Sequence, residues 1–342
     1  MPELLTDVPL RPKEQVAISA TSRVQSLKKQ QSAVFWPWLG GLLVVGVIIV
    51  LSVTYAASNW LNGLQHSTDT GSALPTATIN VQRSAVYMEL HMQLLNVQYA
   101  PTFSDDLIHT GPATVRVNLH VTNPTKNAQG IAYYDSARLL VPKQPPLAPI
   151  NLNLSAQPQG GSSQTGWIDF PVPKNTALKT LVFQLGNVAL GETLVTIPVG
   201  SAYTAGQYDD HLYTVNMNIN YLFQGYRIPA YWLNYHLKTV ETRYSYHGSE
   251  ASAGNQFYIL NFTVDNPNNV QVQPGFGYDY VRLEVNGGHT TPQDNSLPYT
   301  FAAKEHGLSG YIVFEGPANL HPLSIAFLIQ AHPGWNTYSI SL

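Results

Sequence analysis

Two short acidic clusters contain the side chains that hold metal ions, Asp105-Asp106 and Asp209-Asp210-His211. A hard cation needs six or more oxygen ligands, and zinc needs three or four converging ligands. Neither cluster supplies that many, and the 11 histidines show no His-Glu-x-x-His spacing. We therefore predict no metal site and no cofactor, with a calcium site at the second cluster as the alternative.

The sequence also lacks the local motifs of common enzymes. It has no Gly-x-Ser-x-Gly elbow, no P-loop and no dinucleotide-binding fingerprint. The absence of cysteine excludes a thiolate nucleophile and disulfides. Two carboxylates from distant strands could still hydrolyse a glycosidic bond, so a hydrolase stays the minor alternative. We predict that the protein is not an enzyme and has no catalytic residues.

Tyrosine and tryptophan gather in one part of the sequence. Ten of the 20 tyrosines lie between residues 203 and 258. Such rings combine a large contact area with a polar tip, which suits recognition of carbohydrate or protein. They also form strands and fill cores, so a core role is the alternative for each of them. The candidate ligand-binding residues are Tyr221, Tyr226, Tyr231 and Trp232.

These aromatic residues belong to a chain that repeats itself. Residues 115–124 recur at 258–267, and each copy ends in Asn-Pro. Residues 134–141 (YDSARLLV) recur at 278–285 (YDYVRLEV). Proline cannot continue a central strand, and the asparagine before it ends the strand by bonding to nearby backbone. Repetition of these residues therefore indicates a repeated fold.

The matches extend along the chain in the same order. Residues 90–99 match 235–244, and residues 166–170 match 310–314. The last match pairs Leu181, Phe183 and Leu185 with Ile325, Phe327 and Ile329. Apolar residues alternate along each segment, as in half-buried strands. We predict an all-β fold of two tandem antiparallel β-sandwiches, each with seven or eight strands.

The motif order resembles a known family. An alternating strand ending in Asn-Pro, an acidic residue leading a second strand, and Gly-aromatic-Ile-x-Phe followed by Pro173 or Pro317 resemble the telokin-like, immunoglobulin-like bacterial extracellular domains of unknown function. The resemblance covers both copies and implies immunoglobulin-like sandwiches. It implies no catalytic residue. A weaker resemblance is to the late-embryogenesis and water-stress sandwich family, which shares the Asn-Pro turn and the Tyr-Asp pair.

A membrane anchor is predicted before the repeats. Residues 33–57 are almost wholly apolar, and about 20 such residues cross a bilayer as a helix. Arg23, Lys28 and Lys29 precede this run, and no Lys or Arg follows it until Arg83. By the positive-inside rule the N-terminus is cytoplasmic and the rest is exported. The alternatives are a cleaved signal peptide or a buried core helix.

The predicted organisation has six parts. They are a cytoplasmic tail (1–32), a single transmembrane α-helix (33–57), a flexible stalk (58–78), a first immunoglobulin-like sandwich (79–199), a connector (200–211) and a second sandwich (212–342). A net charge of -3 with scattered basic residues argues against nucleic-acid binding.

These observations predict a single-pass protein of the cell membrane whose C-terminal domains are extracytoplasmic. The expected function is that of a non-catalytic surface module that binds a cell-wall glycan, another envelope polymer or another surface protein. The alternative is an envelope protein with a structural or stress-protective role that needs no ligand.

Overall fold

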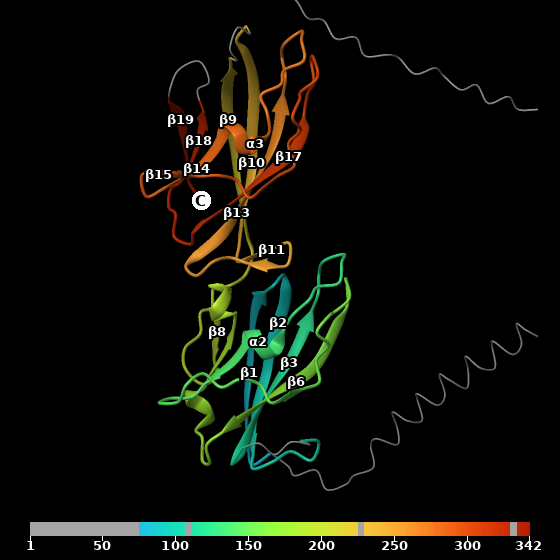
Figure 1. Ribbon diagram of the computed structural model, residues 1–342, viewed down its shortest axis with the longest axis vertical. Helices are drawn as coiled ribbons and strands as arrows, with labels where there is room; N and C mark the ends of the chain where they lie inside the picture. Colours follow the sequence, from blue (N-terminus) through green and yellow to red (C-terminus); the bar gives the residue numbers. More distant parts are fainter. Residues whose placement is uncertain (1–74, 107–110, 225–228, 329–333) are drawn as a thin grey trace, which may run out of the picture. The chain divides into compact units, whose positions relative to one another are not determined.

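The computed structural model describes residues 75–106, 111–224, 229–328 and 334–342. Within these ranges the protein is all-β: antiparallel strands form several sheets, and the helical segments are one turn long (Figure 1). The repeated halves of the sequence each build two sheets around a core of their own.

The predicted N-terminal segments are outside this description. The tail (1–32) and the membrane span (33–57) lie outside the described residues, as does most of the stalk (58–78). Among the described residues, no helix is long and apolar enough to cross a membrane. All described strands belong to one compact unit, Thr70–Leu342.

The first half contains a five-stranded and a three-stranded sheet. The larger sheet has the order β1 (Ala77–Tyr87), β2 (Leu90–Ala100), β3 (Ala113–Thr122), β6 (Ser163–Val172) and β5 (Asn151–Leu152). The smaller has the order β4 (Ala137–Leu140), β7 (Val182–Leu185) and β8 (Val195–Pro198). One-turn helices are α2 (Tyr133–Ser136), η1 (Leu178–Thr180) and η2 (Val188–Leu190). Side chains of both sheets share one hydrophobic core, to which β3 contributes Val115, Val117, Leu119 and Val121.

The second half repeats this plan. Its larger sheet has the order β16 (Asp294–Asn295), β17 (Leu308–Pro317), β13 (Asn255–Asp265), β10 (Tyr231–Arg243) and β9 (His211–Phe223). Its smaller sheet has the order β15 (Gly288–Thr290), β14 (Val281–Val285), β18 (Leu323–Leu328) and β19 (Trp335–Ile340). The remaining elements are the hairpin β11–β12 (Ser245–Tyr246 and Ser249–Glu250) and the one-turn helix α3 (Gly277–Tyr280).

Strand register confirms part of the predicted repeat alignment. Val117 of β3 lies opposite Ile168 of β6, and the equivalent Leu260 of β13 lies opposite Ile312 of β17. Residues 166–170 and 310–314 therefore occupy the same place in the two halves.

Two predicted matches are wrong by two residues. Leu94 lies opposite Leu119, and Leu237 lies opposite the equivalent Phe262, so residues 90–99 correspond to 233–242 rather than 235–244. Both strands carry a register shift just after this position, between Leu94 and Asn96 and between Leu237 and Thr239.

The other misaligned match is at the smaller sheets. Leu139 lies opposite Phe183, and Leu283 lies opposite Ile325, so Phe183 corresponds to Ile325 rather than to Phe327. A slip of two residues keeps every side chain on its own face of the sheet, because strand side chains alternate with a period of two. The apolar pattern alone cannot detect such a slip.

The repeated asparagines tie down the loops that follow β3 and β13. Asn123 and Asn266 are fully buried. The amide nitrogen of Asn123 donates to the carbonyls of Asn127 and Pro158, at 2.8 and 3.0 Å. That of Asn266 donates to three loop carbonyls at 2.7 to 3.1 Å. Their repetition is thus explained by folding, because a buried amide needs such partners.

The buried carboxylate of Glu250 is hydrogen-bonded to both halves of the repeat. Glu250 of β12 accepts hydrogen bonds at Oε2 from the Met88 backbone N–H, at 3.1 Å, and from the Ser245 hydroxyl, at 2.7 Å. Its Oε1 is buried and has no hydrogen-bond partner in the part of the chain that the structure describes. Burial raises the pKa of Glu250 to about 8.

Glu250 makes stability depend on pH. Because its pKa is raised in the folded state, its contribution to stability is fully present below its ordinary pKa near 4.5 and is lost as pH rises through about 8. We expect Glu250→Gln to raise the free energy of unfolding by about 3 kcal/mol near pH 9 and to change it little near pH 5. Urea unfolding at both pH values measures this, with Glu284→Gln as the control. An equal effect at both pH values would contradict it.

Candidate functional site

The acidic clusters do not form a metal site in the described residues. No group of three or more His, Cys, Asp or Glu side chains there is arranged to hold a metal ion. Asp105 is instead bound to Arg116, with oxygen to nitrogen distances of 2.6 and 2.9 Å. Asp106 is buried. Asp210 lies 3.7 Å from the Arg243 guanidinium.

Arg116 is the centre of a buried ionic cluster on β3. Its guanidinium donates two hydrogen bonds of 2.8 Å to the fully buried Asp169 of β6. Its carbon Cζ lies 4.2 Å from the ring centroid of Phe103 and 3.8 Å from that of Trp167. The cluster has every charge paired and is covered by rings, so we assign it a structural role.

The structure describes three of the four predicted ligand-binding aromatics and places them in different environments. Tyr221 is buried, with 2% of its surface exposed. Tyr231 is half-buried and packs against the second core. Trp232 is exposed, and its backbone carbonyl accepts a hydrogen bond of 2.7 Å from Asn268. Tyr226 lies outside the described residues. Of the described three, Trp232 alone presents a large exposed ring.

Tyr221 belongs to an aromatic core. Its ring stacks on that of Tyr280, with centroids 5.1 Å apart and planes at 11°. Tyr235 packs edge-on against both, and its hydroxyl lies 2.7 Å from that of Tyr280. Tyr221 therefore stabilises the second half and cannot contact a ligand at the surface.

An exposed group of three rings lies elsewhere in the second half. We call Phe276, Tyr278 and Tyr299 the aromatic cluster. Their exposed fractions are 40, 43 and 42%. The Phe276 ring stacks on Tyr278 at 5.2 Å between centroids, and lies 5.0 Å from Tyr299. Single exposed apolar residues are ordinary, but here Phe276 contacts both of the other rings, so the three form a patch.

The turn that starts α3 holds the aromatic cluster in place. Gly275 has a φ of +99°, which favours glycine, and it positions Phe276 as the residue before the helix. The Phe276 backbone N–H donates to the Asp279 carboxylate at 2.7 Å. Arg282 donates to the Tyr278 carbonyl, also at 2.7 Å. These bonds order the backbone that carries both rings before any ligand arrives.

Sequence reasoning missed the aromatic cluster because it followed composition. The tyrosine-rich stretch 203–258 supplies core rings, whereas the cluster lies beyond it. One available signal was the repeat itself, since Phe276 corresponds to Ala132 in the first half. An aromatic residue that only one copy has at the start of this helix does not belong to the core that the two copies share.

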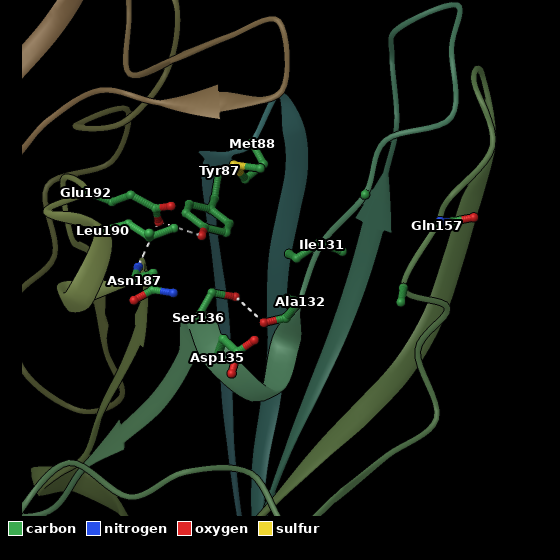
Figure 2. Close-up of a pocket in the computed structure, with 12 residues that line it drawn as sticks. Tyr87, Met88, Ile131, Ala132, Asp135, Ser136, Gln157, Asn187, Leu190 and Glu192 are labelled. Carbon is green, nitrogen blue, oxygen red and sulfur yellow. Dashed lines mark hydrogen bonds between the residues drawn. The ribbon is translucent and has the colours of Figure 1, made fainter.

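The first half has a pocket beside its own one-turn helix, α2. Its volume is about 530 Å³. Figure 2 shows Tyr87 and Met88 at the end of β1, Asp135 and Ser136 on α2, and Glu192 from the loop that follows η2. Ligand pockets are commonly of this size.

The repeat explains why the pocket exists. Ser136 ends α2 just before β4, as Tyr280 ends α3 just before β14. Tyr87 lies opposite Leu90, as Tyr221 lies opposite the equivalent Leu233. In the second half the Tyr280 ring covers Tyr221, whereas the first half has only a hydroxymethyl group at that position. The missing ring leaves space beside Tyr87.

Hydrogen bonds order the polar wall of the pocket. The Tyr87 hydroxyl donates to Glu192 Oε2 at 2.9 Å, and the Asn187 backbone N–H donates to the same oxygen at 2.7 Å (Figure 2). Burial and the adjacent Glu192 carboxylate raise the pKa of Tyr87. The phenol therefore keeps its proton and holds the carboxylate in one orientation.

The geometry defines an all-β protein with an exposed aromatic cluster and a separate pocket. No family model matches the chain, and no curated protein matches it. A crystal structure of a functionally unknown protein from Listeria monocytogenes EGD-e is similar over 38% of this chain and 88% of that chain. The two are 11% identical with a TM-score of 0.29, a likeness too weak to support an argument about fold or function.

Proposed function

We propose that this chain is a non-catalytic binding module that recognises an envelope polysaccharide at the outer face of a cell membrane. It is anchored by a single span over residues 33–57, with the N-terminus in the cytoplasm. The observation that carries the binding function is the aromatic cluster of Phe276, Tyr278 and Tyr299.

The architecture supports an extracytoplasmic module. In each half, two antiparallel sheets share one core, which fits the immunoglobulin-like sandwich that the sequence motifs predict. The resemblance to bacterial extracellular domains and the charge asymmetry around the apolar run agree with this location.

The aromatic cluster suits a sugar polymer. Ring faces pack well against the apolar C–H faces of sugars, and the two tyrosine hydroxyls can bond sugar hydroxyls. The backbone that carries Phe276 and Tyr278 is ordered before binding, which lowers the entropic cost of complex formation. The Asp279 carboxylate of the same turn accepts the Phe276 N–H. We therefore assign Asp279 a structural role in the binding site.

A double substitution tests the proposal. Phe276→Ala with Tyr278→Ala should weaken binding of the full-length protein, in detergent, to soluble cell-envelope polysaccharide by about 30-fold. Isothermal titration measures the affinity. Tyr134→Ala is the matched control, because Tyr134 is the repeat equivalent of Tyr278 and is exposed but has no ring partner among the described residues.

Each outcome distinguishes between the functional classes. Equal affinities for the two variants would contradict the site. Absence of saturable polysaccharide binding by the unaltered protein would contradict the function and favour a structural, ligand-independent envelope protein. Trp232→Ala tests whether the predicted residue Trp232 extends the same surface.

A further inference from the structure

The pocket beside α2 is open to solvent, and buried side chains close its inner wall. Tyr87 and Ser136, which form its deep wall, are 2 and 4% exposed. The Ser136 hydroxyl donates to the Ala132 carbonyl at 3.0 Å, which keeps the side chain folded back against its own helix (Figure 2). The second half fills the equivalent space with the ring of Tyr280.

The pocket is acidic. Asp135 and Glu192 are the charged residues that line it, and no lysine or arginine does. Among the described residues, the Asp135 carboxylate has no hydrogen bond or ion pair. Glu192 uses Oε2 for both of its hydrogen bonds, which leaves Oε1 open.

The second half shows a different use of the carboxylate at the position of Asp135. The equivalent Asp279 accepts the N–H of the residue before α3 at 2.7 Å and so caps its own turn. Within the described parts of the chain Asp135 makes no such bond, and Figure 2 shows its side chain at the pocket. The same position thus has a structural partner in one copy and an open acceptor in the other.

Apolar side chains complete the lining. Met88, Ile131 and Leu190 line the pocket together with the two carboxylates. A ligand that fits these walls has hydrogen-bond donors and positive charge at one end and a compact carbon body at the other, since the two carboxylates would repel an anion and form their strongest hydrogen bonds with charged donors.

From these observations we infer that the pocket is a second binding site, separate from the aromatic cluster, and that it takes a small organic amine. The ammonium group lies against Asp135 and Glu192, and the body of the ligand packs on Met88, Ile131 and Leu190. This site is independent of polysaccharide binding by the second half.

Three sugars of the same ring size provide the test. Glucosamine, glucose and glucuronate differ in charge, and isothermal titration into the full-length protein measures each affinity. Glucosamine should bind saturably, glucose at least about fivefold more weakly, and glucuronate not measurably. All titrations, including those of the variants below, are made in a Phe276→Ala, Tyr278→Ala background, so that sugar bound at the aromatic cluster does not contribute to the measured affinity.

Substitutions locate the binding. Asp135→Asn should weaken glucosamine binding about tenfold and leave glucose binding unchanged, because it removes charge and keeps shape. Ser136→Tyr should abolish binding of both sugars by placing the ring of the second copy in the pocket. Glu284→Gln, in the second half, is the charge-matched control and should have no effect.

Several results would overturn the inference. They are no saturable binding of glucosamine, equal affinity for glucosamine and glucose, and an unchanged affinity in Asp135→Asn. Since Ser136→Tyr changes a buried position, its thermal unfolding is compared with that of the unaltered protein. If Ser136→Tyr does not fold, Asp135→Asn still decides the question, because Asp135 is exposed.

Discussion

Replacing Arg116 by methionine is expected to lower the free energy of unfolding by about 4 kcal/mol. The substitution keeps much of the side-chain volume between the rings of Phe103 and Trp167 but removes the charge. The fully buried Asp169 then loses both of its hydrogen bonds of 2.8 Å. An uncompensated buried carboxylate is costly, so most of the loss arises from Asp169.

Two further variants separate this explanation from a loss of packing. Asp105→Asn should cost less than about 1 kcal/mol, because the Asp105 side chain is 48% exposed and solvent screens its pair with Arg116. Arg116→Met combined with Asp169→Leu should recover most of the lost stability, since apolar residues often replace a buried ion pair without loss. Urea unfolding measures all three variants. A loss below about 1 kcal/mol for Arg116→Met would contradict the assignment.

Replacing Tyr280 by serine is expected to cost about 4 kcal/mol. This variant gives the second half the residue that the first half has at Ser136. Removal of the ring leaves a cavity beside Tyr221, and it removes the hydroxyl partner of Tyr235, whose side chain is fully buried. Both effects act in the same direction, because a cavity loses contacts and an unpaired buried hydroxyl loses a bond.

The neighbouring tyrosine supplies the control for this substitution. Tyr278→Ala alters the same one-turn helix at an exposed ring and should cost less than about 1 kcal/mol. Urea unfolding compares the two. Similar losses for Tyr280→Ser and Tyr278→Ala would show that the helix turn, rather than the filled core, determines stability. That result would also remove the explanation given for the pocket in the first half.

The fold was predictable because strand signals are local and were present twice. Alternating apolar residues such as Val117 and Leu119 identify the buried face, and Asn123 identifies the strand end. Register was less accessible, because a shift of two residues between Phe183 and its equivalent keeps the apolar pattern intact. Hydrogen-bonded pairing settles what alternation leaves open.

The ionic cluster and the pocket were harder to predict. Arg116 and Asp169 are 53 residues apart and meet only because β3 pairs with β6. Alternation along β3 puts Arg116 on the face opposite to Val115 and Val117, where a solvated charge would be expected. To predict the pocket, one must compare Ser136 with Tyr280 and know the strand register that places Tyr87 beside Ser136. Such information depends on pairing between distant segments.

The aromatic residues show why composition predicts a binding surface poorly. Tyrosine packs well in a core and also at an interface, so a count of tyrosines does not separate Tyr221 from Tyr278. Backbone position does separate them. Tyr221 lies on the inward face of β9, and Tyr278 lies on the outer side of a one-turn helix, where its ring contacts Phe276.

Hydroxyl-radical footprinting of the full-length protein, with and without cell-envelope polysaccharide, tests the proposed binding site residue by residue. We expect polysaccharide to protect Phe276, Tyr278 and Tyr299 from oxidation. Tyr134, which is 53% exposed at the equivalent place in the first half, should react equally in both samples. Unchanged oxidation of the three cluster rings in the presence of saturating polysaccharide would contradict the proposed site.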